Sequence, residues 1–178
     1  MTTNLTSPTA EEYATFYDGY VQLALARKDV LAALSLQIDE LVSAMGDLSD
    51  EQARHRFGPG EWSIKEMMGH MNDVERVFSY RLLRVSRNDS TPLPGFEQND
   101  FVNAANFDEW NMGALLEEFE HLRTANSIAI NFMTDETLPR RGTASGATVS
   151  ARALIHMMVG HVEHHMISFR ENYLPGIR

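Results

Sequence analysis

Four segments of the chain repeat apolar residues every three or four positions, which is the spacing of an amphipathic α-helix. They cover roughly residues 29–46, 63–87, 112–132 and 149–173. Each is long enough for four or more helical turns, and strand-like alternation of apolar and polar residues is scarce. The pattern therefore predicts an all-α chain built on four long helices.

The connecting segments suggest how these helices are arranged. Residues 90–107 are rich in Pro, Gly, Asn and Asp and are predicted to form a long crossover, which can join parallel helices in a bundle. Residues 140–145 are predicted to form a second loop, and Pro175-Gly176 to stop the last helix. Residues 11–25 also have helical spacing, and we expect them to pack on the end of the bundle or to extend its first helix. We predict a four-helix bundle with a long crossover connection, in one domain covering residues 1–178.

Composition narrows the possible chemistry. The chain has no cysteine, which excludes thiolate zinc sites, iron–sulfur clusters and a cysteine nucleophile. Its 15 Lys and Arg against 25 Asp and Glu give a net charge of −10, which argues against nucleic acid or an anionic membrane as the main partner. Residues 1–13 lack a basic secretory segment, and no apolar run approaches the roughly 18 residues of a membrane span. We expect a cytoplasmic protein.

The histidines carry most of the functional information, because four of the seven lie on the last predicted helix, inside one stretch of ten residues. At about 100° per residue, His165 falls inside the apolar stripe of this helix and His161 falls on its edge. His164 lies further out, where we expect it to support the other two. His156 is nearly opposite the stripe, so we expect it to be exposed.

His161 and His165 are four residues apart, so their imidazoles stack on one face of the helix and can share a cation. His70, on the edge of the apolar stripe of the second helix, can supply a third ligand. Three neutral nitrogens would leave coordination positions open for water or substrate, as in catalytic metal sites. Taken alone, the spacing of His161 and His165 is equally consistent with two core histidines that are hydrogen-bonded and bind no metal. For His55 and His121 we favour a solvated or structural role.

Two side chains near the predicted site are candidates for proton transfer. Glu75 lies on the flank of the second helix opposite His70, and His164 lies beside the metal-ligand pair. Glu75 and Glu163 could orient an imidazole or take a proton, although a salt bridge or a solvated position is more common for such acids. The candidate catalytic residues are therefore Glu75 and His164.

Three sequence blocks resemble one known family. They are the segments 59–66 (PGEWSIKE), 69–76 (GHMNDVER) and 160–165 (GHVEHH). In this order and at these separations they resemble the DinB-like superfamily, which includes the YfiT-like metal-dependent hydrolases. The resemblance extends over about residues 17–173.

This resemblance implies an up-up-down-down four-helix bundle that is usually a homodimer. It also implies a divalent metal, often nickel or zinc, bound by three histidines, and the matching positions here are His70, His161 and His165. Relatives include transferases and isomerases that use a low-molecular-weight thiol such as bacillithiol, mycothiol or glutathione. Family membership does not fix the substrate.

Two classes of function follow from these observations. The first is a metal-dependent enzyme that activates a low-molecular-weight thiol for transfer to a small-molecule substrate, or activates water for hydrolysis. The second is a metal-stabilised helical bundle without turnover, acting as a stress-response interaction module. A third possibility is that no metal binds and the histidines are neutral core residues.

Overall fold

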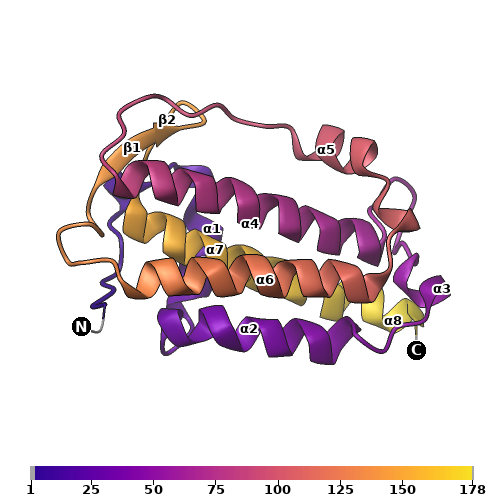
Figure 1. The fold of residues 1–178 in the computed structure, drawn as a ribbon. Helices are drawn as coiled ribbons and strands as arrows, with labels where there is room; N and C mark the ends of the chain where they lie inside the picture. The colour runs from indigo at the N-terminus through magenta and orange to yellow at the C-terminus, as the bar shows by residue number, and fades with distance from the viewer. Residues whose placement is uncertain (1–2, 178) are drawn as a thin grey trace.

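The computed structural model describes residues 3–177, and four long helices form its core (Figure 1). They are α2 (Val30–Met45), α4 (Ile64–Ser86), α6 (Met112–Asn131) and α7 (Ala151–Ser168). Helices α6 and α7 each contact both α2 and α4, so the order around the bundle is α2, α6, α4, α7. The predicted four-helix bundle is confirmed.

Each long helix begins where the sequence offers a capping side chain for the free N–H groups of the first turn. Asp29 accepts a hydrogen bond from the Ala32 N–H at 2.9 Å, and Ser63 forms a reciprocal capping box with Glu66. Asn111 and Ser150 cap α6 and α7 in the same way. These polar residues set the N-termini of the bundle helices.

The direction of the helices differs from the up-up-down-down order that the resemblance implies. Helices α2 and α7 run in one direction and α4 and α6 in the other, so the order along the chain is up-down-down-up (Figure 1). One apolar cluster accordingly joins Met45, at the end of α2, to Ile64 and Met112, which begin α4 and α6. An up-up-down-down bundle needs two long crossovers, and here only the link from α4 to α6 spans the bundle.

This crossover and the later loop both contain regular structure that the sequence pattern did not predict. The crossover includes α5 (Gln98–Ala105) and a 3₁₀ turn (Phe107–Glu109). The loop before α7 is an antiparallel hairpin of β1 (Arg141–Ala144) and β2 (Ala147–Ser150). Leu93 of the crossover pairs with Ala144 at the tip of β1, which fixes the crossover over one end of the bundle.

The N-terminal segment forms two 3₁₀ turns (Ala10–Glu12 and Thr15–Tyr17) followed by α1 (Asp18–Leu25), in place of one continuous helix. Helix α1 packs against the side of α7. It therefore neither covers the end of the bundle nor extends α2, the two arrangements that we expected. At Gly160 the two backbones are so close that an added Cβ would lie 1.8 Å from the Tyr20 carbonyl oxygen. Gly160 therefore permits α1 to lie directly on α7.

The C-terminus departs from the prediction in a smaller way. After α7 the chain forms a π-helical turn, Phe169–Tyr173, and then the short helix α8 (Leu174–Ile177). Pro175 lies within α8, which follows the π-helical turn without a break, so it does not stop the helix as predicted. The short helix α3 (Asp50–Ala53) lies between α2 and α4. Over residues 3–177, no helix has both the length and the apolar character needed to cross a membrane.

Candidate metal centre

Three imidazoles meet in the centre of the bundle, one from α4 and two from α7. The Nε2 atom of His161 lies 3.1 Å from the Nε2 atoms of both His70 and His165. One nitrogen from each ring lies within 4.8 Å of the others, and all three side chains are buried. The structure thus brings together the three residues that the sequence suggested as metal ligands.

The spacing of these nitrogens fits a shared cation. Two imidazole nitrogens bound to one zinc ion at about 2.0–2.1 Å are roughly 2.9–3.4 Å apart in octahedral or tetrahedral geometry. Three nitrogen donors suit zinc, nickel and other borderline divalent metals. The donor set therefore fits a divalent ion held by His70, His161 and His165.

Burial keeps these imidazoles in the neutral form that binds metals. It lowers the pKa of His161 and of His165 well below the ordinary value, and the neighbouring histidines lower both further. Burial, with a smaller contribution from His164, lowers the pKa of His70 to about 4. Near neutral pH each ring has a lone pair available for a metal ion.

Aromatic side chains hold the imidazoles in place. The Tyr20 ring of α1 meets the His161 ring edge-on with centroids 5.4 Å apart, a contact that the close approach at Gly160 makes possible. The Trp62 ring, just before α4, lies 4.6 Å from the His70 ring. Both of these ring contacts come from residues outside the four long helices.

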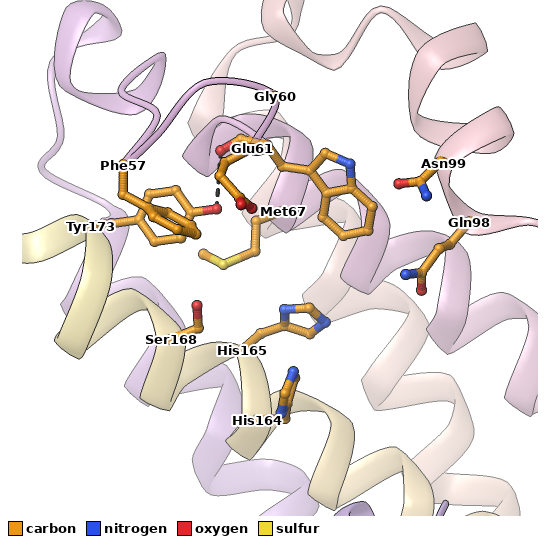
Figure 2. Close-up of a pocket in the computed structure, with 11 residues that line it drawn as sticks. Phe57, Gly60, Glu61, Met67, Gln98, Asn99, His164, His165, Ser168 and Tyr173 are labelled. Carbon is orange, nitrogen blue, oxygen red and sulfur yellow. Dashed lines mark hydrogen bonds between the residues drawn. The ribbon is translucent and has the colours of Figure 1, made fainter. Parts of the chain in front are cut away.

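Among residues 3–177, two of the pockets border these histidines. The first, of about 290 Å³, borders His165 and is lined mainly by polar groups, among them Glu61, Asn99 and Ser168 (Figure 2). We call it the polar pocket. The second, of about 490 Å³, borders His70 and His161, and its aromatic lining consists of Phe16, Tyr17, Tyr20, Phe78 and Phe96. We call it the aromatic pocket, and Gln98 of α5 lines both.

Glu75 has a different place from the one expected of a proton carrier. Its two carboxylate oxygens accept hydrogen bonds from Nε and Nη2 of Arg123, each at 2.9 Å, and Asn126 donates to it at 2.8 Å. It is buried and lines neither the polar nor the aromatic pocket. These contacts place Glu75 in a buried ion pair with Arg123, away from both pockets.

His164 is exposed and lines the polar pocket next to His165, with ring centroids 5.1 Å apart (Figure 2). Of the two candidate proton carriers, it is the one that reaches a pocket. Glu163 accepts a hydrogen bond from Gln37 and pairs with Arg27 at 3.5 Å, as expected for an acid in a salt bridge.

The remaining histidines lie away from the centre. His121 is exposed and His55 is half-buried, in line with a solvated or structural role. His156 is only 1% exposed, so the prediction that it faces solvent is wrong. The helical wheel failed there because α1 and the N-terminal segment cover the outer side of α7, which leaves that helix buried on nearly every face.

Two buried arginines, Arg123 and Arg81, have no place in the sequence-based site. Arg123 interrupts the apolar stripe of α6 and binds Glu75. Arg81, in the second half of α4, donates hydrogen bonds to Tyr17 and Ser145, which line the aromatic pocket. A charged residue at an inward position of an amphipathic helix is the signal that could have revealed Arg123.

Comparison with known proteins identifies the class. The sequence model of the DinB superfamily matches residues 33–167, and the chain belongs to this family. A search of curated proteins finds no significant match.

Two solved structures share the fold. YfiT from Bacillus subtilis, described as "a probable metal-dependent hydrolase with an unusual four-helix bundle topology", superposes with a TM-score of 0.73 at 13% identity, covering 96% of this chain and 93% of YfiT. The mycothiol-dependent maleylpyruvate isomerase superposes with a TM-score of 0.64 at 17% identity, covering 87% of this chain and 62% of the isomerase. At these identities the likeness shows the fold alone.

Proposed function

We propose that this chain is a metal-dependent enzyme that transfers a low-molecular-weight thiol to a small electrophilic substrate. The observation that carries the proposal is the convergence of three buried, neutral imidazoles between two pockets of different character. A divalent ion held by His70, His161 and His165 would lower the pKa of a thiol or water bound to it.

The chain's own groups suit a thiol transfer. With no cysteine in the protein, the sulfur must come from a second molecule, and the polar pocket beside His165 offers space and polar partners for it. We propose that His164, at the edge of that pocket, accepts the thiol proton. The resulting thiolate then forms a bond to an electrophilic carbon of the substrate, while the bond from that carbon to a leaving group breaks and the leaving group departs with the electron pair. The aromatic pocket on the other side would hold the electrophile.

Hydrolysis is the second candidate, favoured by the description of YfiT as a probable metal-dependent hydrolase. It needs the same ion and the same histidines, with water in place of the thiol. A hydrolase, however, requires one organic substrate, whereas this site borders two separate pockets. We therefore place thiol transfer first, with the metal-stabilised interaction module as the outcome expected if no turnover exists.

The first test is the metal content of tag-free protein, measured by elemental mass spectrometry. We expect about one divalent ion per chain in the wild type, a large loss in His165→Ala, and no loss in the matched control His121→Ala, whose ring is exposed and remote. Because a metal that binds only the folded state stabilises it by roughly 3 kcal/mol at 100 times its Kd, removing it should also lower Tm. Stoichiometric metal in His165→Ala would show that the ligand assignment is wrong.

The second test separates thiol from water. In cobalt-substituted protein, millimolar thiol should change the visible spectrum if sulfur enters the coordination shell, and His121→Ala should respond like the wild type. An unchanged spectrum would contradict thiol transfer while leaving hydrolysis open. A protein that takes up neither zinc nor nickel would contradict both enzymatic readings.

We also propose that the chain is a homodimer. The outer faces of α4 and α6 expose Leu83, Ile128 and Phe132, with Phe132 83% exposed, and Leu83 and Phe132 line one groove. Burying these side chains against a second copy would remove apolar surface from water. Phe132→Asp should convert a dimer to a monomer in light scattering, whereas a wild-type monomer would contradict the proposal.

A further inference from the structure

Arg81 carries a buried positive charge without an acidic partner. Its side chain is 2% exposed, and among residues 3–177 no Asp or Glu lies within ion-pair distance of it. Its guanidinium donates instead to three neutral oxygens: Tyr17 Oη at 3.2 Å, Pro94 O at 3.0 Å and Ser145 Oγ at 2.9 Å. Buried charges in proteins are normally paired, so this arrangement leaves a positive potential that favours a nearby anion.

Two of these three oxygens belong to hydroxyl groups of residues that line the aromatic pocket. Tyr17 and Ser145 both border that pocket, and both accept a hydrogen bond from Arg81. Since Arg81 is the donor in each bond, neither hydroxyl uses its own proton there. Within the described chain no acceptor bonds to either proton, so both O–H groups are available to a ligand.

The backbone at Ser145 supports a role for its hydroxyl. Ser145 and Gly146 form the two-residue turn between β1 and β2, with φ angles of +52° and +76°. Such turns favour Asn or Gly at the first position, because a side chain is strained at positive φ. The strained residue here is the one whose hydroxyl contacts Arg81.

The rest of the aromatic pocket joins this hydroxyl pair to the histidines. The Phe78 ring centroid lies 6.0 Å from that of Tyr17 and 6.1 Å from that of His161. Phe16 and Phe96 add further aromatic surface to the lining. A ligand in this pocket would therefore have an apolar, flat body, one end near His161 and the other near Tyr17 and Ser145.

We propose that the aromatic pocket binds a flat unsaturated or aromatic carboxylic acid. The carboxylate accepts hydrogen bonds from Tyr17 and Ser145, Arg81 behind them supplies the opposite charge, and the other end of the molecule faces His161. This inference names the substrate class of the proposed function, and only the assignment of the reacting end rests on that function. Glu97 also lines the pocket, but it is exposed and caps α5 through the Asn99 N–H.

Binding of a probe acid and its neutral counterpart tests the inference. The wild-type protein is titrated with trans-cinnamate and with trans-cinnamamide by isothermal calorimetry, with and without one equivalent of zinc. We expect the acid to bind at least tenfold more tightly than the amide in both conditions, because a hydrogen bond to a charged group contributes more than one to a neutral group.

Substitutions at the pocket locate the carboxylate. Tyr17→Phe and Ser145→Gly should each weaken cinnamate binding about tenfold and leave cinnamamide binding within twofold. Ser145→Gly also relieves the backbone strain, so a loss of folding would not explain its effect. Tyr80→Phe is the matched control, since Tyr80 also accepts a hydrogen bond from an arginine, Arg84, but does not line the pocket. Glu97→Gln should bind cinnamate as well as the wild type or better.

The outcomes separate this inference from the proposed function. Equal affinity for acid and amide, no binding, or unchanged affinity in both Tyr17→Phe and Ser145→Gly would overturn it. Cinnamate binding that requires zinc and ignores these two hydroxyls would place the carboxylate on the metal and also overturn it. If the protein takes up no metal but prefers the acid and loses this preference in Tyr17→Phe and Ser145→Gly, the acid site is supported and the metal-dependent enzyme is contradicted. If the protein binds metal but does not prefer the acid, the acid site is contradicted and the proposed metal centre stands.

Discussion

Arg123 brings a charge into the centre of the bundle, where its side chain is completely buried. Besides its two bonds to Glu75, it donates to Gln37 Oε1 at 2.8 Å and to the Met158 carbonyl at 3.2 Å. Gln37 in turn donates to the Val159 carbonyl at 2.9 Å. The network links α2, α4, α6 and α7, and it reaches the α7 backbone two and three residues before His161.

Breaking this pair should destabilise the fold. Glu75→Gln leaves the guanidinium of Arg123 buried without a counter-charge, and we expect the free energy of unfolding to fall by about 3–5 kcal/mol. Urea denaturation measures the change, and Glu120→Gln, an exposed acid on α6, is the control expected to stay within about 0.5 kcal/mol of the wild type. A stable Glu75→Gln protein that had lost only activity would instead return Glu75 to the role of proton carrier.

Residues of the site could be predicted from sequence when their relationship is local. His161 and His165 are one helical turn apart, so spacing alone places them together. His70 is a possible third ligand from its position on the stripe of the second helix, and the resemblance matches the same residue. Glu75 and Arg123 lie on different helices, and nothing in the spacing of either one identifies the other. Their pairing, and the hydroxyl partners of Arg81, depend on how the helices and the hairpin pack.

At the scale of elements, Gly160 makes the contact between α1 and α7 possible. An alanine methyl group there would clash with the Tyr20 backbone, which cannot move without displacing α1 from α7. We expect Gly160→Ala to lower the free energy of unfolding by about 1–3 kcal/mol and to weaken metal binding, because Tyr20 holds the His161 ring.

The control for this prediction lies in α1. A Cβ at Gly19 meets no atom within 4 Å, so Gly19→Ala should leave stability unchanged or raise it slightly through better helix propensity. Thermal unfolding of the two variants, each with and without zinc, compares them. Equal Tm values for Gly160→Ala and Gly19→Ala would show that α1 is not held against α7 as the structure describes.

The elements that could be predicted are those whose own sequence determines them. The four long helices have continuous apolar stripes and polar caps, and their bounds agree closely with the pattern. Helix α5 is short and mostly polar, so its sequence shows no long apolar stripe that would predict it. Its contact with α4, where Val102 is buried, stabilises it. The four-residue strands of the hairpin are too short for alternation to stand out, and they depend on pairing with each other.

For the whole molecule, the direction of the helices depends on which ends the connections join. The predicted crossover at residues 90–107 does join two parallel helices, α4 and α6 (Figure 1). The segment from α2 to α4 stays at one end of the bundle, so these helices are antiparallel. The length of the connecting segment does not reveal this difference. The segment between α2 and α4 is long, but its residues form α3 and the turns on either side of it instead of crossing the bundle.

The N-terminal segment is tied to the start of α7 by one buried ion pair, and this pair should make the stability of the whole fold depend on acid. Glu12 is 1% exposed and accepts from Arg152 Nε at 2.7 Å. Burial alone would raise the pKa of Glu12, but hydrogen bonds from Arg152, Ser150 and the Thr9 backbone outweigh it and lower the pKa to about 2.

Because the pKa of Glu12 is lower in the folded than in the unfolded chain, its stabilisation is complete above the unfolded value of 4.5 and is lost as the pH falls toward 2. Urea unfolding of wild type and Glu12→Gln at a series of pH values isolates this contribution from the buried histidines and from other acids such as Asp50. We expect Glu12→Gln to be the less stable protein at pH 7 and the difference to shrink between about pH 5 and pH 2.5, because the carboxyl group of the wild type becomes neutral as well. A difference that stayed constant across this range would mean that Glu12 is not ionised against Arg152 in the folded protein, and that this ion pair does not hold the N-terminal segment on α7.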